Sequence, residues 1–228
     1  ELHCATQMHV HNLQGVRNAR KLGFSRVVLA RESTLDLIKE ACKEDIEIET
    51  FVHGAICVSY AGQCLMSSST KNRSANKGMC AQCCRLRYEL YDEDDKKVKT
   101  STDYLLSPKD MFLLNDIPDL IDAGVSSFKI EGRMKRPEYV AAATSACRQA
   151  LDNGRVEAEL ESTLKNVFSR SGFTDGYYTN RLGREMFGIR QKEDVTSATN
   201  QVLKDLSKLY EKEQGSIPVS FYLTVIEG

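Results

Sequence analysis

Five of the eight cysteines lie in one segment, residues 54–87, where their thiols could bind a metal or act as nucleophiles. These cysteines are Cys57, Cys64, Cys80, Cys83 and Cys84. Glycines at positions 54, 62 and 78 interrupt the segment, which is typical of a loop. Six residues separate the first two thiols and fifteen the next two, and a further thiol follows at a spacing of two or three. Four such thiolates can bind zinc tetrahedrally or hold an iron–sulfur cluster.

The spacing bears on which metal centre to expect. Structural zinc sites usually have two closely spaced cysteine pairs, whereas this loop has one, so the pattern favours a cluster over zinc. Two simpler alternatives are a redox-active dithiol and burial of the thiols as small apolar side chains. We expect the remaining cysteines, Cys4, Cys42 and Cys147, to lie in the core.

Charged side chains at the ends of predicted strands are the next candidates for chemistry. Alternation places Lys129, Glu131 and Arg133 on one face of a strand and its extension. Three charges on an inner face are costly unless they pair or bind a ligand. We therefore predict catalytic roles for them, with an internal ion-pair ladder as the alternative. Arg31 and Glu32 end an earlier strand in the same way, and a guanidinium there would suit a carboxylate ligand.

Further candidates lie around the cysteines. His53 precedes Cys57 by four residues and could be a proton donor or a packed histidine. Tyr177 and Tyr178 could stack on an unpaired base or pack in the core. A basic run without an intervening acid could contact phosphates or form a solvated face. It consists of Lys71, Arg73, Lys77, Arg85 and Arg87.

Alternating strand and helix patterns must position these residues. Strands are predicted at residues 2–6, 26–30 and 46–52, with helices at 7–21 and 33–41 between them. This order predicts a parallel sheet with right-handed crossovers. The third strand leads directly into the cysteine loop.

Beyond the loop, a β-hairpin with an acidic turn is predicted over residues 85–102. A helix is then predicted to begin at Pro108 and to end before Gly124, since proline favours the first helical position. A strand follows at 125–130. Pro137 begins an amphipathic helix, and another helix, an irregular segment, a helix at 196–213 and a strand at 217–225 complete the chain. On the Pro137 helix we assign the core-facing stripe to Val140, Thr144, Cys147 and Leu151.

Composition excludes several classes of protein. The chain has 228 residues, of which 41% are hydrophobic and 28% charged, as expected for a globular protein. Its net charge of -1 gives no overall attraction to nucleic acid, so any basic surface must be local. No apolar run is long enough for a membrane helix. Clustered cysteines in such a chain favour metal or redox chemistry and a cytoplasmic location.

The pattern E-x-F-x-x-G-x-x-C-x4-G-x-C-x-x-S, from Glu49 to Ser67, resembles the signature of the peptidase U32 family of collagenase-like proteases. Other similar blocks are residues 29–32, 73–80, 106–110, 128–134 and 168–176. The resemblance implies a (β/α)8 TIM-like barrel followed by a small β-rich domain. It also implies RNA base hydroxylation, at a transfer RNA uridine or a ribosomal cytidine, with a [4Fe-4S] cluster and prephenate as hydroxyl donor.

Residue by residue, the resemblance carries the cluster ligands onto Cys57, Cys64, Cys80 and Cys84. Cys83 is an additional thiol, which leaves the fourth ligand open between Cys83 and Cys84. From their places at strand ends, His53, Lys129, Glu131 and Arg133 form the expected catalytic set. Substrate binding is expected from Arg31, Glu32, Arg73, Lys77 and Arg85.

The resemblance further implies that only the C-terminal half of a barrel is present. We expect a partial barrel over residues 1–192 and a helical linker with the start of a β-domain over 193–228. Such a fragment is expected to be inactive and to associate with itself through an exposed sheet edge.

Two other functions compete with RNA hydroxylation. A U32-type peptidase could use a Cys–His pair, although the sequence has no H-E-x-x-H and no G-x-S-x-G motif. A metal-stabilised RNA-binding module without enzymatic activity is the second alternative.

Overall fold

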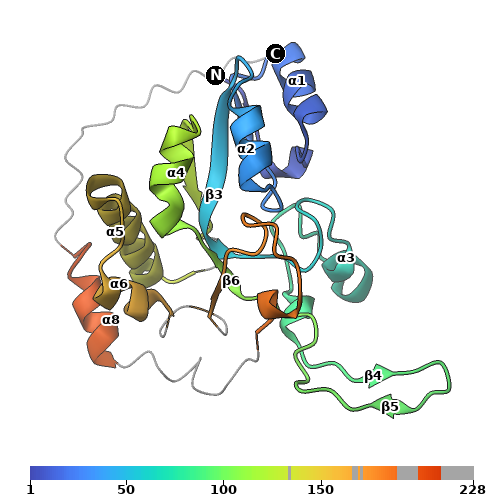
Figure 1. The fold of residues 1–228 in the computed structure, drawn as a ribbon. Coiled ribbons are helices and arrows are strands. Elements are labelled where there is room, and N and C mark those ends of the chain that lie inside the picture. Colours follow the sequence, from blue (N-terminus) through green and yellow to red (C-terminus); the bar gives the residue numbers. More distant parts are fainter. Residues whose placement is uncertain (133–134, 166–168, 170–171, 189–199, 212–228) are drawn as a thin grey trace, which may run out of the picture.

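A computed structural model describes residues 1–132, 135–165, 169, 172–188 and 200–211. It shows a mixed α/β protein with a mostly parallel sheet flanked by helices (Figure 1). The strands follow one another across the sheet in the order β1-β2-β3-β6-β8, and β7 also pairs with β3. The strands are β1 (His3–Cys4), β2 (Arg26–Val28), β3 (Glu47–Ala55), β6 (Asp110–Phe112), β7 (Ser127–Ile130) and β8 (Phe173–Thr174).

β3 is the strand on which the sheet is organised. Its residues 47–49 pair in parallel with β2, and its residues 49–53 pair in parallel with β7. Its last residues pair with β6 in antiparallel register, with His53 opposite Phe112. The predicted parallel pairing of the three N-terminal strands is therefore confirmed, and β1 lies at the edge of the sheet. Self-association through that edge stays a prediction.

The first two helices begin where capping side chains satisfy free backbone N–H groups. α1 (Leu13–Lys21) is capped by Asn12, whose side chain accepts a hydrogen bond from the Gly15 amide. α2 (Leu35–Ala41) is capped in the same way by Thr34. The predicted helix at 7–21 thus begins later than expected, because residues 6–8 form a separate 3-10 turn.

The predicted helix start at Pro108 is wrong. Asp110–Phe112 is the strand β6, because its backbone completes hydrogen bonds to the end of β3. The helix that follows, α4 (Ile117–Asp122), carries Pro118 in its first turn, so proline marks the helix start ten residues later than predicted.

The predicted stripe on the long helix α5 (Pro137–Asn153) is also wrong in part. Val140 is 44% exposed and Thr144 is exposed, whereas Tyr139 and a row of alanines are buried. Small alanine side chains allow the helix to approach its neighbours closely, and Cys147 is buried with them as predicted.

The remaining elements surround this frame. The predicted hairpin is confirmed and extends away from the body of the protein (Figure 1). The hairpin consists of β4 (Leu90–Tyr91) and β5 (Lys97–Val98), and the other remaining elements are α3 (Met66–Lys71), α6 (Ala158–Thr163) and α8 (Asn200–Ser207). α8 packs against α5. The strand predicted at 217–225 lies outside the described residues. None of the helices in the described part of the chain is long and apolar enough to span a bilayer.

Candidate active site

A cavity of about 360 Å³ opens where β3 ends and the cysteine loop begins. Four of the five loop thiols line it, namely Cys57, Cys64, Cys80 and Cys84. Cys83 does not: its side chain is buried, and its Sγ lies 3.3 Å from the Thr70 hydroxyl oxygen. The geometry therefore groups Cys84, and not Cys83, with the other three thiols.

The four thiols interact electrostatically. Burial raises the pKa of Cys57 and of Cys84, and the neighbouring thiols raise both further. Arg31 acts in the opposite direction on the pKa of Cys57, as Arg85 does on that of Cys84. The cation beside each of these two thiols acts in favour of the thiolate, which is the form that binds metals.

We tested whether this donor set fits a metal centre. Within the described ranges, no three or more His, Cys, Asp or Glu side chains are already arranged as metal ligands. The chemistry of the set nevertheless fits, because four soft donors face one cavity large enough for a cluster and cations adjoin two of them. The fit rests on donor type and shared cavity.

Several contacts fix the backbone of the loop. Glu32 accepts a hydrogen bond of 2.9 Å from the Ala61 amide, so this predicted substrate-binding residue holds the loop between the first two thiols. Gly62, at φ +77°, lies against the backbone of residues 6 and 7. The second arm is held by Ser67, whose buried hydroxyl accepts a hydrogen bond from the Ala81 amide at 3.0 Å.

Charged side chains form another part of the cavity wall. Arg31, Lys129 and Glu131 all line the cavity, so strand alternation places the last two together as expected. Arg31 forms an ion pair with Glu131, and its guanidinium carbon lies 4.0 Å from the centre of the Phe51 ring. Lys129 is 3.4 Å from a carboxylate oxygen of Glu49. The two described charges of the predicted ladder thus pair with Arg31 and Glu49, which are not members of it, and Arg133 lies outside the described residues.

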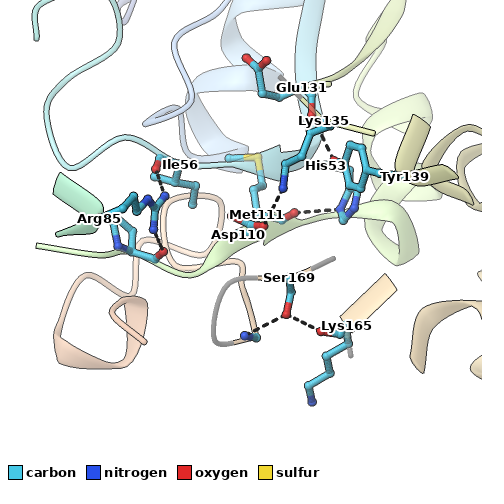
Figure 2. Close-up of polar contacts among 12 residues, drawn as sticks. His53, Ile56, Arg85, Asp110, Met111, Glu131, Lys135, Tyr139, Lys165 and Ser169 are labelled. Atoms are coloured by element: carbon cyan, nitrogen blue, oxygen red, sulfur yellow. Dashed lines mark hydrogen bonds and ion pairs between the residues drawn. The ribbon is translucent and has the colours of Figure 1, made fainter. Parts of the chain in front are cut away.

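Sequence reasoning missed a buried ion pair beside this wall. Lys135 also lines the cavity, and its Nζ lies 3.6 Å from Oδ2 of Asp110 (Figure 2). Both side chains are almost fully buried, at 11% and 3% exposure. Asp110 borders the apolar run that begins at Met111, and a charge in that position signals a buried partner.

His53 lies in the core and does not line the cavity. Its Nδ1 is 3.0 Å from the Met111 carbonyl oxygen, to which the neutral ring donates a hydrogen bond (Figure 2). The ring stacks on Tyr139 and meets Phe112 and Phe173 edge-on. Burial lowers the pKa of His53 to about 4, so it is uncharged at neutral pH. This is the packed histidine that the sequence left open as an alternative.

The basic run divides into a buried and an exposed part. Arg85 is buried and donates hydrogen bonds to the Ile56 carbonyl, at 2.7 Å, and to Ser107 and Pro108 (Figure 2). It therefore braces the base of the loop instead of reaching solvent. Arg73 and Lys77, by contrast, are exposed and form no ion pair with any described residue.

The two candidate tyrosines, for which stacking and core packing were the alternatives, are buried to different extents. Tyr178 is buried, and burial raises the pKa of its hydroxyl well above the ordinary value. Tyr177 is half-buried; burial raises the pKa of its hydroxyl, and nearby Glu32 and Cys57 raise it further.

Comparison with protein families matches residues 1–188 to peptidase family U32. The tRNA hydroxylation protein P1 of Bacillus subtilis is 41% identical over 218 residues, covering 89% of this chain and 51% of that protein. A 23S rRNA 5-hydroxycytidine synthase of Escherichia coli is 41% identical, over 80% of this chain and 30% of its own length. A collagenase of Porphyromonas gingivalis is 37% identical, over 80% of this chain and 49% of its own length.

The chain thus spans about half or less of the length of these relatives. No solved structure matches the chain.

Proposed function

Because the chain belongs to peptidase family U32, whose members similar to it include proteins named for tRNA and rRNA hydroxylation, we propose that it hydroxylates a pyrimidine base of RNA. The observation that carries this proposal is one cavity lined both by four thiols and by the cations Arg31, Lys129 and Lys135. We place the reaction in the cytoplasm, with transfer or ribosomal RNA as the substrate.

In this proposal the thiols of Cys57, Cys64, Cys80 and Cys84 hold a [4Fe-4S] cluster, with zinc as the alternative ion. When bound, the cluster supplies one-electron or Lewis-acid chemistry at the thiol end of the cavity. The protein's own contribution is to offset part of the burial-induced rise in the pKa of two thiols and to keep the loop fixed. Arg31 and Arg85 support the first, and the Glu32–Ala61 hydrogen bond supports the second.

The cationic wall would bind a small carboxylate that donates the hydroxyl group, for which prephenate is our candidate. Lys129 is the most accessible of the wall cations, with a side chain 36% exposed, and its ion pair with Glu49 is long at 3.4 Å. Arg31 is already held by Glu131, so its guanidinium is oriented before any ligand arrives. Preorganised charge of this kind binds a carboxylate without first rearranging.

The exposed cations beside the cavity would contact the RNA backbone. Lys71, Arg73 and Lys77 are exposed and make no ion pair with the described residues, so their charge is available to phosphates. We also propose that β1, β2, β3 and β7 belong to a (β/α)8-type barrel, in which sites form at the carboxyl ends of strands. The cavity adjoins that end of β3.

A peptidase is the less favoured reading. No histidine of the described residues lines the cavity, and the ring of His53 is engaged by the Met111 carbonyl. A Cys–His pair is therefore not assembled around the loop thiols. The name of the collagenase relative is the main argument for it.

The proposal is tested by complementing a deletion strain with the full-length protein and analysing RNA nucleosides by mass spectrometry. We expect the wild-type protein to restore a hydroxylated pyrimidine and Cys64→Ser to abolish it. Cys83→Ser is the matched control and should retain the product, because its thiol faces Thr70 and not the cavity. A wild-type protein that restores no hydroxypyrimidine but cleaves a purified protein in a cysteine-dependent manner would overturn the proposal.

The cluster is tested separately by iron, sulfide and zinc analysis after anaerobic purification. Cys64→Ser should lower iron and sulfide, and Cys83→Ser should not. Stoichiometric zinc, without iron uptake on anaerobic reconstitution, would count against the cluster. RNA binding without any modified nucleoside would favour the non-enzymatic binding module.

A further inference from the structure

Tyr60 is an exposed aromatic side chain at the mouth of the cavity. It lies between Cys57 and Cys64, lines the cavity, and is 65% exposed. An aromatic ring that is largely in water contributes little to the core. Its position beside four thiols therefore calls for a reason other than folding.

The backbone that carries Tyr60 is fixed on its C-terminal side. Glu32 accepts the hydrogen bond of the next amide, that of Ala61. The Gly62 backbone lies against residues 6 and 7, where an added Cβ would come within 3.3 Å of the Gln7 Cα. Asn76 donates a hydrogen bond of 2.7 Å to the Gly62 carbonyl oxygen. An exposed ring on a pinned backbone loses little freedom when a ligand stacks on it.

Polar and aromatic groups of the right kind surround the ring. The His9 ring meets Tyr60 edge-on, with centroids 6.0 Å apart, and His11 adjoins His9 at 4.5 Å. The amide side chains of Gln7, Asn76 and Gln82 line the same cavity. Amides both donate and accept hydrogen bonds, as the edge of an unpaired base requires.

We propose that Tyr60 is a base-stacking residue, on which an unpaired pyrimidine lies at the entrance of the cavity while the cavity amides contact its edge. This inference rests on the proposed function and names how the RNA is positioned. Arg73 and Lys77, exposed on the other arm of the loop, favour a nucleic acid over a peptide as the occupant, because they attract phosphates. Sequence-specific RNA recognition commonly stacks single-stranded bases on tyrosine in this way.

The test compares Tyr60→Ala with Tyr60→Phe in the full-length protein. The probe is a fluorescent RNA stem-loop with a loop of seven uridines, and binding is followed by anisotropy at one fixed salt concentration. Stacking on an aromatic side chain contributes enough that Tyr60→Ala should weaken binding about tenfold, or ~1.4 kcal/mol. Tyr60→Phe keeps the ring and should bind within about twofold of wild type. An RNA duplex of matched length should bind all three proteins alike.

Equal binding of the stem-loop by wild type and Tyr60→Ala would overturn the inference. So would an equal loss in both variants, since that would assign the effect to the hydroxyl group. A loss of affinity confined to an unstructured peptide probe would also overturn it. Thermal melting of Tyr60→Ala should match wild type because the side chain is exposed, and this separates a binding defect from misfolding.

The binding measurement distinguishes this inference from the proposed function. If Tyr60→Ala weakens stem-loop binding and the wild-type protein makes no hydroxypyrimidine, stacking stands and hydroxylation falls. If hydroxylation is restored equally by wild type and Tyr60→Ala, with equal binding, hydroxylation stands and stacking falls.

Discussion

Replacing Gly54 with alanine should destabilise the protein far more than a glycine substitution usually does. Gly54 lies near the end of β3 with φ at +123°, a region that residues with a Cβ rarely adopt. An added Cβ would lie 2.7 Å from both the Cβ and the carbonyl oxygen of Glu131. The Glu131 backbone cannot easily retreat, because its amide donates a 2.9 Å hydrogen bond to the His53 carbonyl.

The expected magnitude is the sum of two effects. The left-handed backbone conformation costs about 1–2 kcal/mol for a residue with a Cβ. Overpacking against the Glu131 backbone adds about 1–3 kcal/mol. Gly54→Ala should therefore lower the free energy of unfolding by about 2–5 kcal/mol, a large part of the stability of a typical domain.

Gly23→Ala is the matched control. Gly23 also has a positive φ, at +86°, but no atom lies within 4 Å of its added Cβ. Both substitutions reduce the entropy of the unfolded chain alike, so this term cancels in the comparison. Only the first effect applies to Gly23→Ala, and we expect a loss of about 1–2 kcal/mol.

The assay is urea-induced unfolding of both variants and wild type, followed by circular dichroism. The slopes should agree and only the midpoints should move. If Gly54→Ala is destabilised no more than Gly23→Ala, then β3 does not approach residue 131 as closely as described.

Three further outcomes are expected from unfolding and binding measurements. Burial holds the pKa of His53 near 4, below its unfolded value of 6.5. Its contribution to stability is therefore complete above pH 6.5 and is lost as the pH falls toward 4. Of its charged neighbours, Asp110 raises the pKa of His53 and Lys135 lowers it. Wild type should lose about 2 kcal/mol more than His53→Gln between pH 7 and pH 5, and parallel losses would refute a buried neutral ring. Lys135→Met should lower the free energy of unfolding by about 3–5 kcal/mol, because the Asp110 carboxylate stays buried without the lysine. Adding Asp110→Asn should recover part of this loss. If the losses from the two substitutions simply add, the two residues do not form a stabilising ion pair. Arg85→Lys should lower stability by about 2–4 kcal/mol because its buried hydrogen bonds are lost. Arg73→Ala should leave stability unchanged but should weaken RNA binding, with a smaller salt dependence. A stable Arg85→Lys together with a destabilised Arg73→Ala would contradict these assignments.

Local patterns were sufficient for much of the frame. The strand and helix order of residues 1–55 follows from short β-branched runs, capping residues and glycines. The hairpin after the cysteine loop was also predictable, since two strands flank an acidic turn. Grouping the four thiols at one cavity agrees with the ligand set that the family resemblance implies.

The errors share one physical cause, which is contact between residues far apart in the chain. Ser107 and Pro108 have the local chemistry of a helix start, but hydrogen bonds to β3 win and make a strand of the next residues. Arg85 is as basic as Arg73 in the sequence, yet acceptors at Ile56 and Pro108 draw it into the protein. Only the folded chain brings those acceptors together.

The place of β3 in the sheet has a consequence for synthesis on the ribosome. Glu49 of β3 accepts a hydrogen bond from Ser127, the first residue of β7, across a separation of 78 residues, whereas Arg26 and Glu47 are 21 apart. At about 5–20 residues per second, translation needs roughly 4–16 seconds to supply that later strand. In the later part of this interval, once Cys84 has been made, the loop thiols are present but β7 and its Lys129 are absent. If the proposed cluster is correct, iron delivery and oxidants would then compete for an open loop, and the cell's protection of nascent thiols would matter most in those seconds.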